Sequence, residues 1–200
     1  MSFLNRWIDE LKEYNRIAKI AEIARRYFAM NGFDGTLTAL GICLAAYFTN
    51  IENPALVLAT GLGAAVAMGI SGVWGAYFAE KAERTKQVRE LEEATLSKLR
   101  GTKIGRAATA ATLIVALVDG LAPFLAAIIV LSPVFFAYSL GARTAYLASI
   151  GIAFVLLFLL GAFLGSLSRE NIFKYGFIMT IAGIVITLLN FLLLGGGLYR

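Results

Sequence analysis

The sequence predicts an all-α membrane protein with five transmembrane helices, and three observations support this fold class. The chain of 200 residues is 59% hydrophobic, and its mean hydropathy is +0.76, well above that of a soluble domain. Its apolar residues form five stretches long enough to cross a bilayer, which takes about 20 residues each. Most lysines and arginines lie in alternate connections between these stretches, as the positive-inside rule requires.

The five apolar stretches are separated by charged or turn-forming segments. They cover residues 27–49, 54–79, 107–138, 144–167 and 172–198. We expect the chain to consist of an amphipathic N-terminal helix, two spans, a charged cytoplasmic helix and three further spans, which occupy residues 1–26, 27–79, 80–106 and 107–200.

The first 26 residues predict a helix with one apolar face. The apolar residues recur at helical intervals: Phe3, Leu4, Trp7, Ile8, Leu11, Tyr14, Ile17, Ala18, Ala21 and Ala24. Acidic residues such as Asp9 and Glu13 interrupt the segment, which is not typical of a signal peptide. The apolar face is suited to the membrane surface or to a partner helix. An ordinary first helix that covers the rest of the protein is an equal alternative.

The basic residues predict the orientation. Sixteen lysines and arginines lie in the N-terminal segment, the 80–106 connection and the 168–174 turn, whereas Arg143 and Arg200 lie on the opposite side. This bias places the N-terminus in the cytoplasm. We expect a multi-pass protein of the plasma (cell) membrane, or of an internal storage membrane in a eukaryote. The net charge of +5 comes from basic residues beside the spans, where they set the orientation in the membrane. Nucleic acid is therefore not an expected partner.

The composition excludes several kinds of chemistry. Histidine is absent, and Cys43 is the only cysteine. A histidine zinc site, an intramolecular disulfide framework and a CxxC centre are therefore excluded. The chain also has no nucleophile motif and no phosphate-binding loop, so we expect neither an enzyme nor a permanently bound cofactor.

Two acidic residues lie inside the predicted spans. Asp34 stands a turn or two inside the first span, and Asp119 lies near the middle of the third, about 20 Å along the helix from Arg106. Acids at this depth are costly, usually face a cavity and mark ion or proton pathways. A bound cation favours the ionised form and low dielectric the protonated form, so one carboxylate can exchange a metal ion for a proton. The structural alternatives are a helix N-cap for Asp34 and an interhelical hydrogen bond for Asp119.

Proline and sulfur-containing residues accompany these acids. Pro123 follows Asp119 by four residues and removes a backbone hydrogen bond there, so the long third span must kink, tilt, protrude or stop early near Pro133. Met30 is one turn before Asp34, and Met68 lies in the second span. Sulfur suits softer transition metals, which adds both methionines to the expected transport pathway. Packing remains the simpler role for each sulfur.

The charged connection carries a second candidate metal site. At 100° per residue, Glu80, Glu83 and Glu90 share one helix face, with Glu93 at its edge. Such carboxylates can capture a divalent cation. A solvated, salt-bridged helix explains the same residues equally well, because Glu80–Arg84, Lys86–Glu90 and Arg89–Glu93 are i,i+4 pairs.

Several segments resemble the vacuolar iron transporter family. The resemblance rests on "YFAMNGFDGTLTALGICLAAY", "AAVAMGISGVWGAYFAEKAERTKQVRELEE", "DGLAPFLAAIIVLSP" and "LLGAFLGSLSRENIFKYGFIMTIAGIVITLLNFLLLG" within residues 25–198. It implies a homodimer that moves Fe²⁺, and sometimes Mn²⁺, out of the cytosol in exchange for protons. It also implies that Asp34 is the pore carboxylate and that Glu80, Glu83, Glu90 and Glu93 stand near the metal-capturing glutamates.

The sequence departs from that family at the end of the second span. Members typically read Ser-Met-Ala-x-Gly-Glu-Tyr, whereas this chain has Gly72 in place of the methionine and Ala76 in place of the glutamate. Met68 and Glu80 each lie one turn away and are candidate substitutes. The connection is also shorter than the family's metal-binding domain.

The expected function is a divalent metal cation/proton antiporter that exports metal from the cytoplasm. Asp34, Asp119, Met68 and Met30 form the expected pathway, and Asp34, Glu80, Glu83, Glu90 and Glu93 the expected metal ligands. The expected partners are the metal ion, protons, the bilayer and a second copy of the chain. A non-transporting binding or assembly protein on the same scaffold and a small organic cation transporter are the alternatives.

Overall fold

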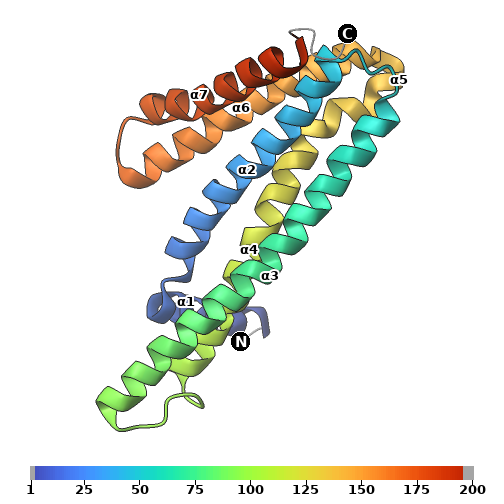
Figure 1. Ribbon diagram of the computed structural model, residues 1–200. Coiled ribbons are helices and arrows are strands. Elements are labelled where there is room, and N and C mark those ends of the chain that lie inside the picture. Colours follow the sequence, from blue (N-terminus) through green and yellow to red (C-terminus); the bar gives the residue numbers. More distant parts are fainter. Residues whose placement is uncertain (1–2, 196–200) are drawn as a thin grey trace. The chain divides into compact units, whose positions relative to one another are not determined.

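The computed structural model describes residues 3–195, and within them every regular element is a helix (Figure 1). The element order is α1 (Phe3–Ala18), α2 (Ile20–Phe48), α3 (Pro54–Thr95), α4 (Lys103–Leu131), η1 (Ser132–Phe136), α5 (Ala137–Leu140), α6 (Ala142–Ser168), α7 (Ile172–Asn190) and η2 (Phe191–Gly195). Within the described residues, five stretches are long and apolar enough to cross a membrane: Ile20–Phe48, Pro54–Thr95, Lys103–Leu140, Ala142–Ser168 and Ile172–Leu194. The protein is thus an all-α, multi-pass membrane protein, as the sequence predicts.

The N-terminal boundary differs from the prediction. Helix α1 ends at Ala18 rather than at residue 26, because Lys19 adopts a left-handed backbone conformation with φ of 51°. Helix α2 begins at Ile20, and the Asn15 side chain accepts a hydrogen bond of 2.7 Å from the backbone N–H of Ala21. The first spanning helix therefore starts with a charged turn, seven residues before the predicted position.

The second and third spans follow the sequence more closely. Helix α3 runs without a break from the apolar stretch into the charged connection. Helix α4 contains Pro123 and stops at Leu131, just before the 3₁₀ turn that holds Pro133. The α conformation is unfavourable for a residue that precedes proline, here Ser132 before Pro133. This accounts for the end of α4 at Leu131. Gly141, with φ of 83°, then separates α5 from α6.

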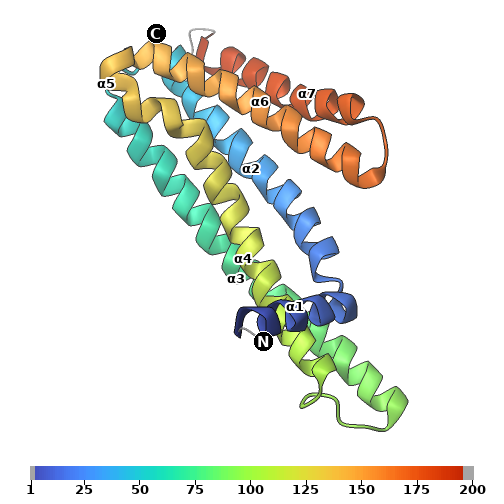
Figure 2. The same ribbon diagram turned by 180° about the vertical axis from the view of Figure 1, so that it is seen from behind.

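The chain divides into two compact units, and the first comprises Met1–Phe28 and Ile70–Leu121. In this unit α3 and α4 lie side by side in both views (Figures 1 and 2). Its core contains Ala18, Ile20, Ala107 and Ala111, with Tyr14 packed against it. The end of α1 thus covers α4, as in the alternative of an ordinary first helix. The side chains of residues 3–8 and of Leu11, predicted on the same apolar face, lie outside the described part of the chain.

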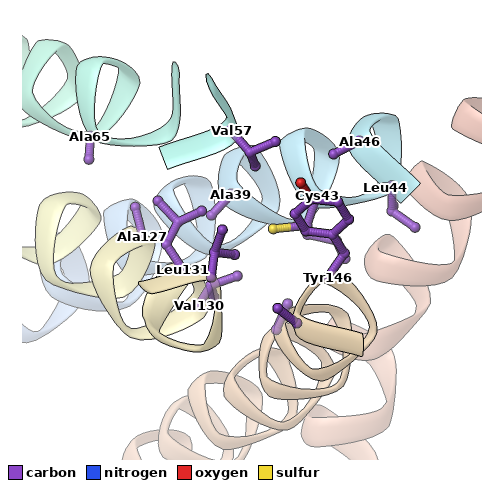
Figure 3. Close-up of a cluster of buried hydrophobic side chains, with 14 of the residues drawn as sticks. Ala39, Cys43, Leu44, Ala46, Val57, Ala65, Ala127, Val130, Leu131 and Tyr146 are labelled. Carbon is purple, nitrogen blue, oxygen red and sulfur yellow. The ribbon is translucent and has the colours of Figure 1, made fainter. Parts of the chain in front are cut away.

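The second unit comprises Ala29–Gly69 and Ala122–Arg200 and holds the larger core. Cys43, Leu44, Val130, Leu131 and Tyr146 are almost completely buried there (Figure 3). Helices α6 and α7 form a hairpin with close backbone contact, in which a Cβ on Gly161 would lie 2.8 Å from the Cα of Gly176. Gly161 and Gly165 therefore pack against α7 of the same chain. The end of the fifth predicted span, residues 196–198, falls outside the described residues.

Candidate functional site

Asp34 lies in the middle of α2, with 14 helical residues before it and 14 after it. This position excludes the N-cap alternative, because a cap lies at the start of a helix. The Asp34 side chain is exposed, and its backbone carbonyl accepts a hydrogen bond of 2.9 Å from the Thr38 hydroxyl. Counted from Arg26, the carboxylate stands about 12 Å into the apolar part of the helix. A carboxylate at this depth that the chain does not cover needs water, a cation or a partner subunit.

The glycine after Asp34 allows close packing in the second unit. A Cβ built on Gly35 would lie 2.6 Å from the Cα and 2.8 Å from the carbonyl carbon of Pro123. Only hydrogen fits in this space, so α2 and α4 meet here at backbone distance. The exposed side chain of Asp34 therefore lies next to the point where α2 and α4 cross.

The sulfur-containing residues fall into two groups. Met30, one turn before Asp34 on α2, is 53% exposed and lies on the same side of the helix. Met68 packs against the core of the second unit, and Cys43 is completely buried in it (Figure 3). Packing therefore explains Met68 and Cys43, whereas the exposure of Met30 leaves its thioether available beside Asp34.

Asp119 lies in the interior of α4 within the first unit and is 7% exposed. Its backbone is in contact with α3, since a Cβ on Gly72 would lie 3.0 Å from the Asp119 carbonyl oxygen and 2.9 Å from the Cα of Gly120. Gly72 is one of the two positions where the chain departs from the iron transporter pattern. A methionine at this position would collide with the backbone of α4 as the two helices are packed here.

Three glutamates of the charged part of α3 pair with basic side chains one turn away along the helix. Glu80–Arg84, Lys86–Glu90 and Arg89–Glu93 form ion pairs of 3.3, 3.9 and 3.1 Å, which confirms the three predicted i,i+4 pairs. Glu83 accepts a hydrogen bond of 2.9 Å from the Gln87 side chain. Among the described residues, no three acidic or cysteine side chains come close enough together to hold a metal ion.

Glu80 differs from the other three glutamates because it is buried. Its side chain is 10% exposed and pairs with Arg84, whose side chain is 11% exposed. The second guanidinium nitrogen of Arg84 donates a hydrogen bond of 3.1 Å to the backbone carbonyl of Ala18. Glu80 thus orients an arginine that attaches α3 to the end of α1.

Sequence reasoning missed the role of Glu92. This carboxylate accepts hydrogen bonds of 2.6 and 3.2 Å from the backbone N–H groups of Leu99 and Arg100. These bonds hold the pKa of Glu92 below its ordinary value, because they favour the ionised form. Glu92 therefore closes the turn between α3 and α4, and the helix-face analysis carried no signal for this contact.

A second unpredicted feature is a pair of buried hydroxyls in the second unit. The Ser149 hydroxyl lies against the Cys43 thiol, a weak hydrogen-bonding group. Neither this hydroxyl nor that of Tyr146 makes a hydrogen bond of ordinary geometry within the described chain. Tyr146 also borders a pocket of about 430 Å³ that includes Tyr47, Glu52 and Arg143.

The comparison with known proteins places the chain in a family. No family model matches it. The chain is 31% identical over 175 residues to the uncharacterized protein MJ0645 of Methanocaldococcus jannaschii, covering 86% of this chain and 89% of that protein. The chain belongs to the MJ0645 family. The match extends over nearly the whole length of both chains and is not confined to one apolar helix.

Proposed function

We propose that this protein exports a divalent cation, Fe²⁺ or Mn²⁺, from the cytoplasm in exchange for protons. The observation that supports it most strongly is the exposed carboxylate of Asp34 inside a membrane-spanning helix. An ionised side chain facing lipid at this depth would be strongly unfavourable. Alternate binding of a cation and a proton gives the carboxylate a favourable partner in both states.

The surroundings of Asp34 are suited to this cargo. Met30, one turn away, is exposed and adds a soft sulfur ligand beside the hard carboxylate oxygens. The thioether suits Fe²⁺ better than Mg²⁺ or Ca²⁺, and the carboxylate oxygens also suit Mn²⁺. The single carboxylate provides too few ligands by itself, so we propose that a second copy of the chain completes the site in a homodimer.

The remaining acids take separate roles in this proposal. Asp119, in the interior of α4, serves the pathway or the proton. Glu83, Glu90 and Glu93 are exposed on the charged part of α3 and attract the cation before it enters. Glu80 has a structural role because of its pairing with Arg84. We further propose a cytoplasmic N-terminus, because most basic residues lie in the N-terminal segment, the 80–106 connection and the 168–174 turn, and a location in the cell membrane.

The test is metal-dependent proton flux in liposomes that contain the purified protein. Asp34→Asn keeps the size of the side chain but cannot ionise, so it should abolish flux driven by Mn²⁺ or Fe²⁺. Glu52→Gln is the matched control, because Glu52 is an exposed acid in the connection between α2 and α3. If the Asp34 variant transports like the wild type, Asp34 has no part in the mechanism.

A non-transporting assembly protein is the second candidate, and the ion pairs along α3 favour it. Each of Glu80, Glu90 and Glu93 already has a basic partner. A scaffold would bind partners through this charged helix and would need no metal site. Calorimetric titration with Mn²⁺ separates the two functions, since the scaffold predicts no saturable binding and the transporter predicts binding that Asp34→Asn weakens.

A further inference from the structure

A pocket of about 460 Å³ lies between α3 and α4 in the first unit. Its volume is within the range of about 300–1,000 Å³ typical of small-molecule sites. The side chains that line it come from the last apolar turns of α3, the following charged turns, the α3–α4 turn and the start of α4. Among the lining residues are Tyr77, Lys81, Arg84, Thr85, Arg100 and Leu113.

The polar lining of this pocket favours an anion. Three cationic side chains, those of Lys81, Arg84 and Arg100, line the pocket, and none of the described residues in its wall carries a carboxylate. The side chains of Lys81 and Arg100 are both exposed, whereas Arg84 is already paired with Glu80. Arginine and lysine are the usual partners of phosphate oxygens. Two charges are therefore available for a phosphate.

Lys81 is positioned by an aromatic neighbour. Its ammonium lies 5.3 Å from the centre of the Tyr77 ring and donates a hydrogen bond of 3.4 Å to the Tyr77 hydroxyl. Both interactions involve a neutral partner, so the charge of Lys81 is not cancelled. The Thr85 hydroxyl in the wall adds a donor for a further phosphate or glycerol oxygen, whereas the hydroxyls of Thr109 and Thr112 already donate to backbone carbonyls of α4.

The position of the pocket favours a lipid over a soluble anion. Trp74 and Phe78, which flank Tyr77 along α3, are 65% and 57% exposed, and such aromatic side chains gather at the membrane–water interface. On α4, Leu113 and Leu117 are 51% and 53% exposed. Leu113 lines the pocket, so the pocket joins the apolar surface of α4. A ligand with a phosphate at one end and a hydrocarbon chain at the other matches this pocket.

We propose that this pocket binds the phosphate headgroup of an anionic membrane lipid. Lys81 and Arg100 hold the phosphate, and the acyl chains lie along Leu113 and Leu117. Basic pockets between membrane helices on the cytoplasmic side have the chemistry that such headgroups need. This proposal does not depend on the transport proposal, because it uses none of the acids assigned to the cation pathway.

The test measures lipid binding to the full-length protein in a nonionic detergent, by native mass spectrometry and by thermal shift. Phosphatidylglycerol should bind saturably and raise the midpoint of unfolding, and phosphatidylcholine should bind more weakly. The double variant Lys81→Gln/Arg100→Gln should lose on the order of 30-fold in affinity for phosphatidylglycerol, from the contribution of two basic residues near an anionic headgroup. The variant Lys81→Arg/Arg100→Lys keeps both charges and should retain most of the binding.

The matched control is Lys86→Gln/Lys98→Gln, which removes two exposed charges from the same helical hairpin but outside the pocket. It should bind phosphatidylglycerol like the wild type. Equal losses in the two double variants would show that binding follows net charge, and would overturn the proposal. Inorganic phosphate at the same concentration should leave the midpoint of unfolding unchanged. If it instead displaces the lipid and stabilises the protein equally, the site takes a soluble phosphate and the lipid assignment is wrong.

Discussion

Gly72 of α3 lies against the backbone of Asp119 in α4, so closely that a Cβ on Gly72 would stand 3.0 Å from the Asp119 carbonyl oxygen. Because Gly72 has no side chain, α3 and α4 can approach each other closely beside the buried acid Asp119. The iron transporter pattern has methionine at this position. A side chain at position 72 would therefore change the packing of α3 against α4.

We expect Gly72→Ala to destabilise the protein, although alanine favours helix more than glycine does. Overpacking against a backbone costs about 1–3 kcal/mol, which exceeds the roughly 1 kcal/mol gained in helix propensity. Gly75→Ala is the matched control on the same helix, because nothing lies within 4 Å of its Cβ position. The midpoint of thermal unfolding in detergent should fall for Gly72→Ala and stay equal or rise for Gly75→Ala. Equal midpoints would contradict the close contact.

The pair formed by Glu80 and Arg84 gives the second prediction. Replacing Glu80 with glutamine leaves the largely buried guanidinium of Arg84 without its carboxylate, although its hydrogen bond to Ala18 remains. The variant should therefore lose ~1–3 kcal/mol of stability, which is less than the loss expected when a fully buried ion pair is broken. Glu83→Gln, three residues away on an exposed part of the helix, should change stability by less than about 0.5 kcal/mol. Chemical unfolding of both variants without metal provides the measurement. A Glu80 variant as stable as the wild type would return Glu80 to the set of candidate metal ligands.

The features that could be predicted from the sequence are those that depend on short separations along the chain. The five spans follow from apolar runs, and the ion pairs of α3 follow from i,i+4 spacing. The bond between Arg84 and the carbonyl of Ala18 joins residues 66 positions apart, and no local pattern indicates it. The close contact of Gly72 with Asp119 likewise depends on how two helices cross, so the sequence could suggest small residues for packing but not their partners.

The site was predictable to a similar degree. Asp34 is recognisable because a lone acid in an apolar run is rare, and its exposure agrees with a polar or ionic partner. The glutamates of α3 share helix faces as predicted, but the basic residues one turn away neutralise several of them. Whether a glutamate on such a face is open to a cation or paired with a basic residue depends on side-chain conformation. The spacing of residues in the sequence does not specify that conformation.

Glu92 gives a prediction of pH dependence. Its ordinary pKa is 4.5, and the hydrogen bonds from Leu99 and Arg100 lower it in the folded protein. A lowered pKa means that the stabilisation of the α3–α4 turn is complete above the unfolded pKa and is lost as pH falls through the folded value. Hydrogen exchange of the Leu99 and Arg100 amides, corrected for intrinsic rates, should therefore show constant protection from pH 7 to about 5 and loss below the lowered pKa.

The controls for this experiment are two alanine variants. Glu92→Ala should leave both amides weakly protected at every pH, because the acceptor is gone. Glu93→Ala, which removes an exposed carboxylate paired with Arg89, should keep the wild-type profile. Identical profiles for the two variants would show that the carboxylate of Glu92 does not hold the turn in solution.

The buried hydroxyl of Tyr146 leads to the last prediction. The residue is 1% exposed, and its hydroxyl has no hydrogen-bond partner within the described chain. A buried polar group without a partner costs roughly 1–3 kcal/mol, so Tyr146→Phe should leave the protein equally stable or make it more stable. Tyr138→Phe is the control, since Tyr138 is 80% exposed and its hydroxyl reaches solvent or headgroups. A lower unfolding midpoint for Tyr146→Phe alone would mean that the hydroxyl binds an ordered water in the adjoining pocket, which is wide enough to hold one.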